Sequence, residues 1–468
     1  MHPTPNSVAV PTTRRTFLQH SALAGAAFGF PAVLRAANPN SRVQLAAIGV
    51  NARGYGDLHS VASHAKAKFV AFCDIDQANF AKADADHPGT PHFADFRAML
   101  EKLGDTVDAV IVATPDHMHA PIGYSAMQLG KHVYGQKPLA HNIYETRMLT
   151  TIAREKSLVT QMGIQIHSQK VYRQAVAIVH SGAIGKVKEV HTWSNKKWGD
   201  VGAPPSRTDP LPANFDWNLW IGTAAERPYV TGHYHPGNWR KRLDFGTGTF
   251  GDMGCHIFDP VFKALALTAP LSLRSIGPAP DQWNWAVNAN IRYVFPGTAF
   301  TADKTVAVTW YDGDARPPAE IRALIASTKP ISSTTVDDTG RPGKKQRQSE
   351  PDQGSIIIGT EGILLIPHIA TPKLFPEVKF ADYKLPDVAG THHWTDWAEA
   401  IVGGPGKPSA HFGYAGPLTE AVLLGSIAAR FPQTNLNWNA AKLTFENEKS
   451  ANQYVRRTYR KGFEVAGL

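Results

Sequence analysis

The sequence feature that most constrains the fold is a glycine-containing turn between an apolar strand and a helix. A second strand, which ends in an acid, follows that helix. Residues 43–58 read VQLAAIGVNARGYGDL and hold Gly49-x-Asn51-x-x-Gly54. The next apolar run ends at Asp74, twenty residues after Gly54. In a βαβ unit this spacing lets the turn hold a pyrophosphate while the acid accepts hydrogen bonds from ribose hydroxyls. Asn51 replaces the middle glycine, and asparagine adopts left-handed backbone angles more readily than most residues.

The acid at position 74 has two interpretations. As a ribose ligand it repels a 2′-phosphate, so the cofactor is expected to be NAD rather than NADP. As a purely structural residue, Asp74 caps the helix predicted over the following segment, DQANFAKA. The GxNxxG motif alone is weak evidence for a dinucleotide site. Its position after a strand and before a helix strengthens that interpretation.

Strands and helices alternate along the first part of the chain. Apolar runs of strand length alternate with helical segments up to about residue 163, which predicts an N-terminal Rossmann domain (41–163) with a doubly wound parallel sheet. The remainder, 164–468, is expected to form an α+β domain for substrate binding and oligomerisation. Its strand-like segments predict an open, largely antiparallel sheet, and its helices include AGPLTEAVLLGSIAARF (415–431), with sustained apolar periodicity.

The first 37 residues have the features of an export signal. Arg14 and Arg15 precede the apolar run SALAGAAFGFPAVL, and small residues follow near position 36. This pattern is typical of a twin-arginine signal, whereas a disordered N-terminus is the alternative. The run is too short to span a bilayer, so no stable membrane insertion is expected. The export machinery is then a partner, the location is periplasmic or otherwise exported, and the cofactor is loaded before export.

Positive charge is concentrated rather than spread. The net charge of +9 includes three arginines of the leader and four basic residues in GRPGKKQRQ (340–348), which reads as a solvated surface loop. Clustered basic residues also occur in nucleic-acid sites. The loop interpretation is preferred here, and no nucleic-acid partner is expected.

Three later motifs identify a resemblance. ATPDHMHAP (113–121), GKHVYGQKPLA (130–140) and GTFGDMGCHIFD (248–259) follow the glycine turn, and together they resemble the Gfo/Idh/MocA family of sugar-related oxidoreductases. The resemblance implies that Lys137 lies beside a nicotinamide. One departure is Gln136, where the family usually has glutamate; the amide keeps an acceptor but loses a charge.

The resemblance also implies roles for individual residues. Lys137 is expected to orient a hydroxyl and relay its proton, Asp252 to bind substrate, and His256 to act as general acid or base. Without the family, Asp252 and His256 would read as an ion pair on a helix surface. The expected cofactor contacts are Gly49, Asn51, Arg53, Gly54, Asp74, Thr114, Pro115, His117, His119, Gln136, Lys137 and Gln165.

A tryptophan-rich stretch, 191–246, suits the apolar faces and hydroxyl rims of sugar rings. Trp239 and Arg240 are the expected substrate contacts, together with Asp252 and His256, whereas Trp217 and Trp220 are equally well explained as core residues. Histidine pairs such as His117-x-His119 lack a tight ligand spacing, so no catalytic metal is expected.

These features favour an NAD-dependent oxidoreductase with a tightly held nicotinamide, acting on a hydroxyl of a sugar, polyol or glycoside. One alternative is an NAD-dependent glycosidase that uses transient oxidation and elimination. Another is a non-catalytic sugar-binding protein with structural NAD. A carbohydrate substrate and a homo-oligomer, either dimer or tetramer, are expected.

Overall fold

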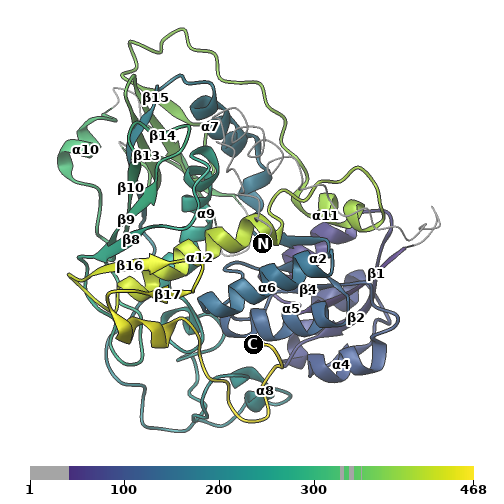
Figure 1. The fold of residues 1–468 in the computed structure, drawn as a ribbon. Coiled ribbons are helices and arrows are strands. Elements are labelled where there is room, and N and C mark those ends of the chain that lie inside the picture. Colours follow the sequence, from purple (N-terminus) through teal and green to yellow (C-terminus); the bar gives the residue numbers. More distant parts are fainter. Residues whose placement is uncertain (1–41, 327–330, 337–341, 349) are drawn as a thin grey trace, which may run out of the picture. The chain divides into compact units, whose positions relative to one another are not determined.

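The computed structural model describes residues 42–326, 331–336, 342–348 and 350–468 (Figure 1). The predicted leader, 1–37, lies outside the described residues. The described chain begins with a six-stranded parallel sheet in the order β3-β2-β1-β4-β5-β6. Its strands are β1 (Val43–Ile48), β2 (Ala67–Cys73), β3 (His92–Phe93), β4 (Ala109–Val112), β5 (His132–Gly135) and β6 (Thr160–Met162).

Helices cover both faces of this sheet. The connecting helices are α2 (Arg53–Ala62), α3 (Ala81–Asp86), α4 (Phe96–Leu103), α5 (His119–Gln128) and α6 (Ile143–Glu155), with short 3-10 turns η1 (Gln77–Phe80) and η2 (Asp116–Met118). Successive residues of a strand point to opposite faces. Ile48 therefore packs with α4, α5 and α6, whereas Ala47 packs with α2 and α3. The predicted doubly wound sheet is confirmed.

A nine-stranded sheet follows, in the order β15-β14-β13-β7-β10-β9-β8-β16-β17. Only its β7–β10 pair is parallel among the described strand pairs. The predicted open, largely antiparallel sheet is confirmed. Its strands are β7 (Val187–Ser194), β8 (Ser272–Ser275), β9 (Asn290–Pro296), β10 (Thr305–Asp312), β13 (Gln353–Gly359), β14 (Ile363–Pro367), β15 (Lys373–Phe375), β16 (Asn435–Asn439) and β17 (Thr444–Phe445).

Helices α9 (Gly248–Ala264) and α12 (Phe412–Ala428) pack against this second sheet and against each other. Helix α12 also packs on α6 of the first sheet (Figure 1). Most residues of α12 are buried, because it has neighbours on several sides. The sequence predicted the helix correctly, but its apolar residues surround the whole helix rather than forming one face. The other helical segments are η3 (Gln165–Ser168), α7 (Lys170–His180), α8 (Trp217–Ile221), η4 (Asn238–Lys241), α10 (Ala319–Ala323), α11 (His393–Ile401) and η5 (Lys449–Tyr454).

The basic stretch predicted as a surface loop is instead part of a hairpin. Strands β11 (Ile331–Val336) and β12 (Pro342–Gln348) pair antiparallel and form a separate two-stranded sheet. The proline and the two glycines at the start of the stretch suggested a loop, but neither residue type excludes an edge strand. The loop interpretation of this stretch was therefore wrong.

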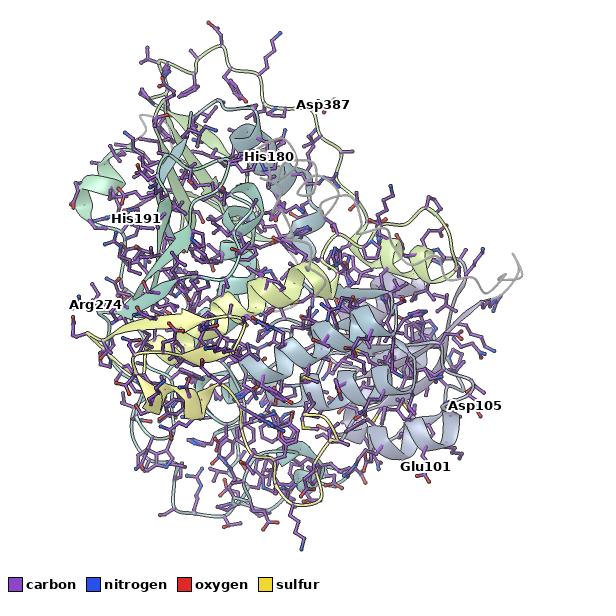
Figure 2. All side chains as sticks on the ribbon, viewed as in Figure 1. Glu101, Asp105, His180, His191, Arg274 and Asp387 are labelled. Atoms are coloured by element: carbon purple, nitrogen blue, oxygen red, sulfur yellow. The ribbon has the colours of Figure 1, made fainter. Side chains whose placement is uncertain are left out.

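Several charged side chains project from the surface of the described chain. Glu101 and Asp105, at and after the end of α4, project away from the ribbon, as do Arg274 and Asp387 (Figure 2). Among the described helices, none is both long and apolar enough to cross a membrane.

Residues far beyond position 163 complete the surroundings of the first sheet. Helix α11 packs on α2, and its Trp397 belongs to the same core as Ala47. Arg457, near the end of the chain, donates a 2.8 Å hydrogen bond to buried Glu145 of α6. The predicted boundary at 163 stays a prediction, but the two parts of the chain share their packing.

Candidate active site

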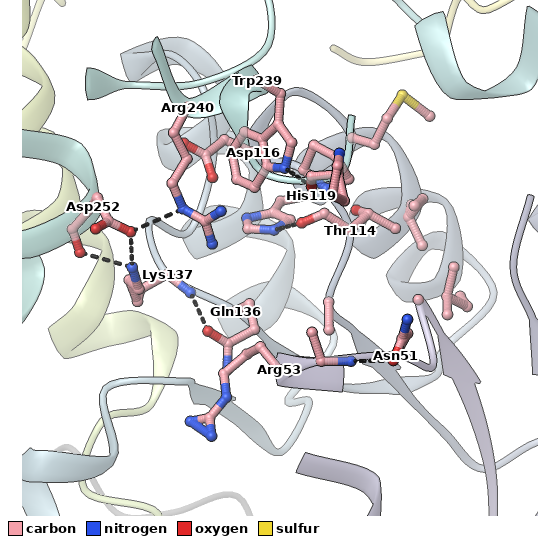
Figure 3. Close-up of a pocket in the computed structure, with 18 of the residues that line it drawn as sticks. Asn51, Arg53, Thr114, Asp116, His119, Gln136, Lys137, Trp239, Arg240 and Asp252 are labelled. Atoms are coloured by element: carbon pink, nitrogen blue, oxygen red, sulfur yellow. Dashed lines mark hydrogen bonds and ion pairs between the residues drawn. The ribbon is translucent and has the colours of Figure 1, made fainter. Parts of the chain in front are cut away.

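A cavity of about 570 Å³ lies at the carboxyl ends of the first sheet's strands and reaches α9 (Figure 3). Ligands of open α/β sheets bind at this edge, because the connecting loops of neighbouring strands converge there. Most of the predicted site residues line the cavity: Gly49, Asn51, Arg53, Asp74, Thr114, Pro115, His119, Gln136, Lys137, Gln165, Trp239, Arg240, Asp252 and His256. Gly54 and His117 do not.

The glycine turn brings the backbone of β1 close to that of β4. Gly49 has a φ of +80°, and a Cβ there would lie 2.6 Å from the carbonyl oxygen of Ala113. A Cβ at Gly54 would lie 1.9 Å from the Gly49 oxygen, so Gly54 permits the helix to approach the turn rather than touching a ligand. The left-handed non-glycine residue is Ala52, with φ 45°, and not Asn51 as the sequence suggested. Asn51 instead uses its side chain, which bonds Asn79 at 2.7 Å.

Asp74 directly follows β2 and faces the cavity. Its carboxylate accepts hydrogen bonds from the Val50 amide (3.0 Å), the Asp76 amide (3.1 Å) and Asn79 Nδ2 (2.9 Å). Burial raises the pKa of Asp74, and the donated hydrogen bonds oppose that rise. The residue that caps the following helical turn is Asp76, which accepts from the Ala78 amide. The capping alternative for Asp74 is therefore wrong.

Lys137 and Asp252 meet on the opposite side of the cavity. Lys137 follows β5 after one residue, and its Nζ lies 2.7 Å from both the carbonyl oxygen and Oδ1 of Asp252 on α9. Arg240 Nε lies 3.2 Å from the same Oδ1, and its guanidinium stacks 4.3 Å from the Trp239 ring. Both cations contact Oδ1, so Oδ2 keeps acceptor capacity for a ligand.

The charges and burial in this cluster favour an ionised Asp252 and a neutral His256. Burial alone raises the pKa of Asp252, but Lys137 and Arg240 outweigh it and hold that pKa well below its usual range. Burial, reinforced by the charge of Lys137, keeps the pKa of His256 well below its ordinary value. Near neutral pH the site therefore holds a carboxylate beside a neutral imidazole. His256 follows Asp252 by four positions on α9, which puts both on one face of the helix.

The segment that follows β4 contributes two buried histidines, His117 and His119. His119 places both ring nitrogens 2.7 Å from carbonyl oxygens, those of Pro138 and Thr114. This links the ends of β4 and β5. His117 does not line the cavity: it is fully buried, and its Nε2 lies 3.1 Å from the carbonyl oxygens of Trp220 and Ile221. The prediction of His117 as a cofactor contact is corrected, because its ring is buried against the end of α8 and does not line the cavity.

The tryptophans of the middle segment are mostly core residues. Trp217, Trp220 and Trp239 belong to one aromatic cluster with Phe215 and Phe245. Trp220 and Trp239 also line the cavity, whereas Trp217 does not. The substrate assignment of Trp239 and Arg240 is compatible with their position beside Asp252, and it stays a prediction.

Several lining residues were not anticipated from the sequence. Asp116 accepts a 2.7 Å hydrogen bond from Thr247, and burial raises its pKa. It lies inside the TPDHMH motif, so the motif could have indicated it. His368 and Phe463 come from the end of strand β14 and the C-terminal segment, and no local pattern marks either. Burial, with Lys196 and Lys137, lowers the pKa of His368 to about 4. Within the described residues, no group of three or more His, Cys, Asp or Glu is arranged to hold a metal ion.

Two family models match this chain. Residues 43–164 match the Gfo/Idh/MocA model described as "Oxidoreductase family, NAD-binding Rossmann fold". Residues 170–296 match the model of the same group described as "Oxidoreductase family, C-terminal alpha/beta domain". Together the matches cover more than half of the sequence and include every predicted catalytic residue.

Curated relatives are similar over part of their length. The chain is 30% identical over 206 residues to a glycosyl hydrolase family 109 protein of Saccharopolyspora erythraea, covering 38% of this chain and 44% of that protein. It is 23% identical over 167 residues to levoglucosan dehydrogenase of Pseudarthrobacter phenanthrenivorans, covering 36% and 34%. The matched segments thus span less than half of each relative.

A solved structure shares the fold over most of the chain. The WlbA dehydrogenase from Bordetella pertussis, in complex with NADH and UDP-GlcNAcA, superposes with a TM-score of 0.56 at 13% identity, covering 85% of this chain and 99% of that one. At this identity the likeness concerns the arrangement of the two sheets.

Proposed function

Because this chain belongs to the Gfo/Idh/MocA oxidoreductase family, we propose that it oxidises a hydroxyl-bearing carbon of a sugar, polyol or glycoside with a tightly held NAD, which a second, electron-accepting substrate reoxidises before the next turnover. The observation that carries the proposal is the Lys137–Asp252 pair beside neutral His256, in the same cavity as the glycine turn.

The residues present fit a dinucleotide. The Gly49 turn leaves no room for a side chain, and the N-terminus of α2 follows it, where backbone N–H groups favour a phosphate. Thr114 and Pro115, which follow β4, line the cavity beside this turn. Asp74 supplies the acceptor for ribose hydroxyls. An acid there favours NAD over NADP.

When bound, NAD supplies the acceptor for a hydride from the substrate carbon. The chain's own residues manage the hydroxyl. His256, neutral near pH 7, takes the hydroxyl proton on an unprotonated ring nitrogen. Lys137 donates to the hydroxyl oxygen, and Asp252 Oδ2 accepts from a neighbouring hydroxyl and so orients the sugar. The face of Trp239 provides an apolar surface for ring C–H groups.

A second function is supported by the family 109 relative. If oxidation acidifies the C–H next to the new carbonyl, a base can remove that proton and the glycosidic leaving group departs as its alcohol. Water then adds to the resulting unsaturated ketone, and the carbonyl is reduced again. This cycle leaves the cofactor unchanged, and 30% identity over 206 residues to a protein named as a glycosyl hydrolase favours it as the alternative.

Location and assembly complete the proposal. The twin-arginine pattern at Arg14 and Arg15 supports export of the folded protein with its cofactor inside, to the periplasm or beyond the cell. A dimer or tetramer is proposed on the family membership alone.

Mass spectrometry of products from a panel of sugars and glycosides tests the function. A product lighter by two hydrogens supports the oxidoreductase, and release of the aglycone with cofactor unchanged supports the glycosidase. If no panel member is converted while NAD is bound stoichiometrically, the catalytic proposal is wrong and a sugar-binding protein with structural NAD takes its place.

A further inference from the structure

The side-chain amide of Gln136 is buried, and both of its polar atoms have protein neighbours. It is 4% exposed, and its Nε2 lies 2.7 Å from Oδ2 of Asp57. Its Oε1 lies 3.4 Å from the backbone nitrogen of Lys137, and Gln136 lines the cavity (Figure 3). A Cβ at position 163 would lie 2.2 Å from Nε2, so Gly163 leaves the space that this amide occupies.

Asp57 is a buried carboxylate that the proposed chemistry does not use. It lies on α2, is fully buried and does not line the cavity. Besides Gln136, it accepts hydrogen bonds from Trp394 Nε1 at 2.8 Å and the Tyr134 hydroxyl at 3.4 Å. Burial raises its pKa, whereas the charge of Arg53 and these three donors oppose the rise.

This set of partners determines which way the amide of Gln136 faces. The indole N–H of Trp394 can only donate, so the Asp57 carboxylate acts as an acceptor in this contact. Gln136 contacts the other oxygen, Oδ2, and with Asp57 ionised it presents its NH₂ there, because its amide oxygen would face another acceptor. The carbonyl oxygen is left toward Lys137 and the cavity.

We propose that Asp57 is a positioning residue that locks Gln136 with its oxygen toward the cavity, so that position 136 offers bound NAD an uncharged hydrogen-bond acceptor. The matching ligand group is an N–H or O–H donor of the nicotinamide nucleoside. The negative charge is that of Asp57 on α2, behind Gln136 as seen from the cavity. Hydrogen-bond donors of the protein, rather than the ligand, stabilise it. This inference rests on NAD binding but not on the identity of the substrate.

Exchanging the two groups tests the arrangement. The variants are Asp57→Asn, Gln136→Glu and the double variant, with Asp86→Asn as control, since Asp86 lies on α3 outside the cavity and also pairs with a tyrosine hydroxyl. Calorimetry gives the Kd of the cofactor-free protein for NAD, and thermal unfolding without NAD gives Tm.

Gln136→Glu alone puts a second buried carboxylate about one hydrogen-bond length from Asp57, so Tm falls and Kd rises roughly tenfold or more. Asp57→Asn alone permits either amide orientation and raises Kd by roughly three- to tenfold. In the double variant the amide introduced at position 57 donates to the new carboxylate at position 136, so Kd and Tm recover most of the loss seen in Gln136→Glu. The control leaves both unchanged.

Additive losses in the double variant would overturn the proposal and assign Asp57 a purely structural role. If Asp57→Asn does not fold, the pH dependence of NAD binding by Gln136→Glu tests the proposal instead. Its two carboxyls share a proton at low pH, so its Kd for NAD must improve toward wild type as the pH falls from about 8 to about 5.5. A pH-independent Kd would refute the pairing. Wild-type Kd is measured first, so failure to bind NAD is distinguished from failure of the positioning role.

Discussion

Lys137 and Asp252 hold each other across 115 positions of sequence through two hydrogen bonds of 2.7 Å, one to the backbone and one to the carboxylate. Both side chains are only 13% exposed. The pair joins the carboxyl edge of the first sheet to the helix that packs on the second sheet. Its geometry thus depends on both parts of the fold.

Lys137→Met and His256→Ala should each lower turnover by roughly 10² or more, because each removes a positioned proton donor or acceptor. Retention of NAD should change little. The double variant should lose less than the product of the single losses, since both residues serve one proton transfer. Lys197→Met, which removes an exposed lysine paired with Asp314, is the control. Single-turnover kinetics on the best panel substrate measure these effects; near-normal turnover in His256→Ala would contradict the assigned base.

Asp74→Ala should raise the Kd for NAD by roughly tenfold or more, because a charged acceptor for ribose hydroxyls is lost. The Kd for NADP should rise less or even fall, since the acid no longer faces a 2′-phosphate. Calorimetry with both nucleotides measures the ratio. Equal losses for the two would remove the ribose assignment.

Phe463→Ala should speed release of NAD. Phe463 lines the cavity, and the guanidinium carbons of Arg97 and Arg460 lie 4.6 Å and 4.3 Å from the centre of its ring. Loss of such a buried aromatic surface corresponds to roughly a three- to tenfold weaker Kd. Stopped-flow displacement gives the release rate. Lys461→Ala, an exposed change two residues away, serves as the control, and identical rates in both variants would exclude the C-terminal segment from the cofactor site.

His393→Gln should make the protein less sensitive to acid. Burial, with the nearby His167, lowers the pKa of His393 to about 3 from an ordinary value of about 6.5. The unfolded chain therefore binds the extra proton first, and stability falls as the pH drops below about 6.5, by up to roughly 1.4 kcal/mol per pH unit. The variant is less stable at about pH 8, having lost the 2.9 Å hydrogen bond to Met162, but its gap to wild type should narrow by about pH 5. Urea unfolding at both pH values checks this, and a constant gap would show that His393 does not titrate on unfolding.

Arg14→Lys combined with Arg15→Lys should keep the protein in the cytoplasm, because the export route is addressed by the arginine pair. Fractionation followed by blotting measures the distribution. A substitution of Arg35→Lys, outside the pair, should leave export intact. Unchanged export of the double variant would refute the twin-arginine assignment.

Sequence reasoning succeeded where chemistry follows a local pattern. Short-range periodicity and spacing predicted the turn at Gly49 and the strand that ends before Asp74. Asp252 and His256 were indicated by the family resemblance, and the segment that carries them is helical. Within these motifs it was wrong about the residue with positive φ, which is Ala52 rather than Asn51, and about His117, which does not line the cavity.

The remaining features depend on contacts between distant segments. Asp57 reads as an ordinary polar position on an amphipathic helix until Trp394, more than three hundred residues later, is seen to donate to it. His368 and Phe463 reach the cavity through the topology of the second sheet and the path of the C-terminal segment. No single-sequence spacing rule encodes such pairings, because they are chosen by tertiary packing.

The return of the C-terminal segment to the first sheet sets the order in which a newly made chain can mature. When residues up to 163 have left the ribosome, all six strands of the first sheet exist, but buried Asp57 still lacks its indole donor and buried Glu145 lacks Arg457. These carboxylates gain their partners only once Trp394 and Arg457 have been synthesised. The polar contacts that complete the surroundings of the first sheet can therefore form only after residues far beyond its last strand have been synthesised.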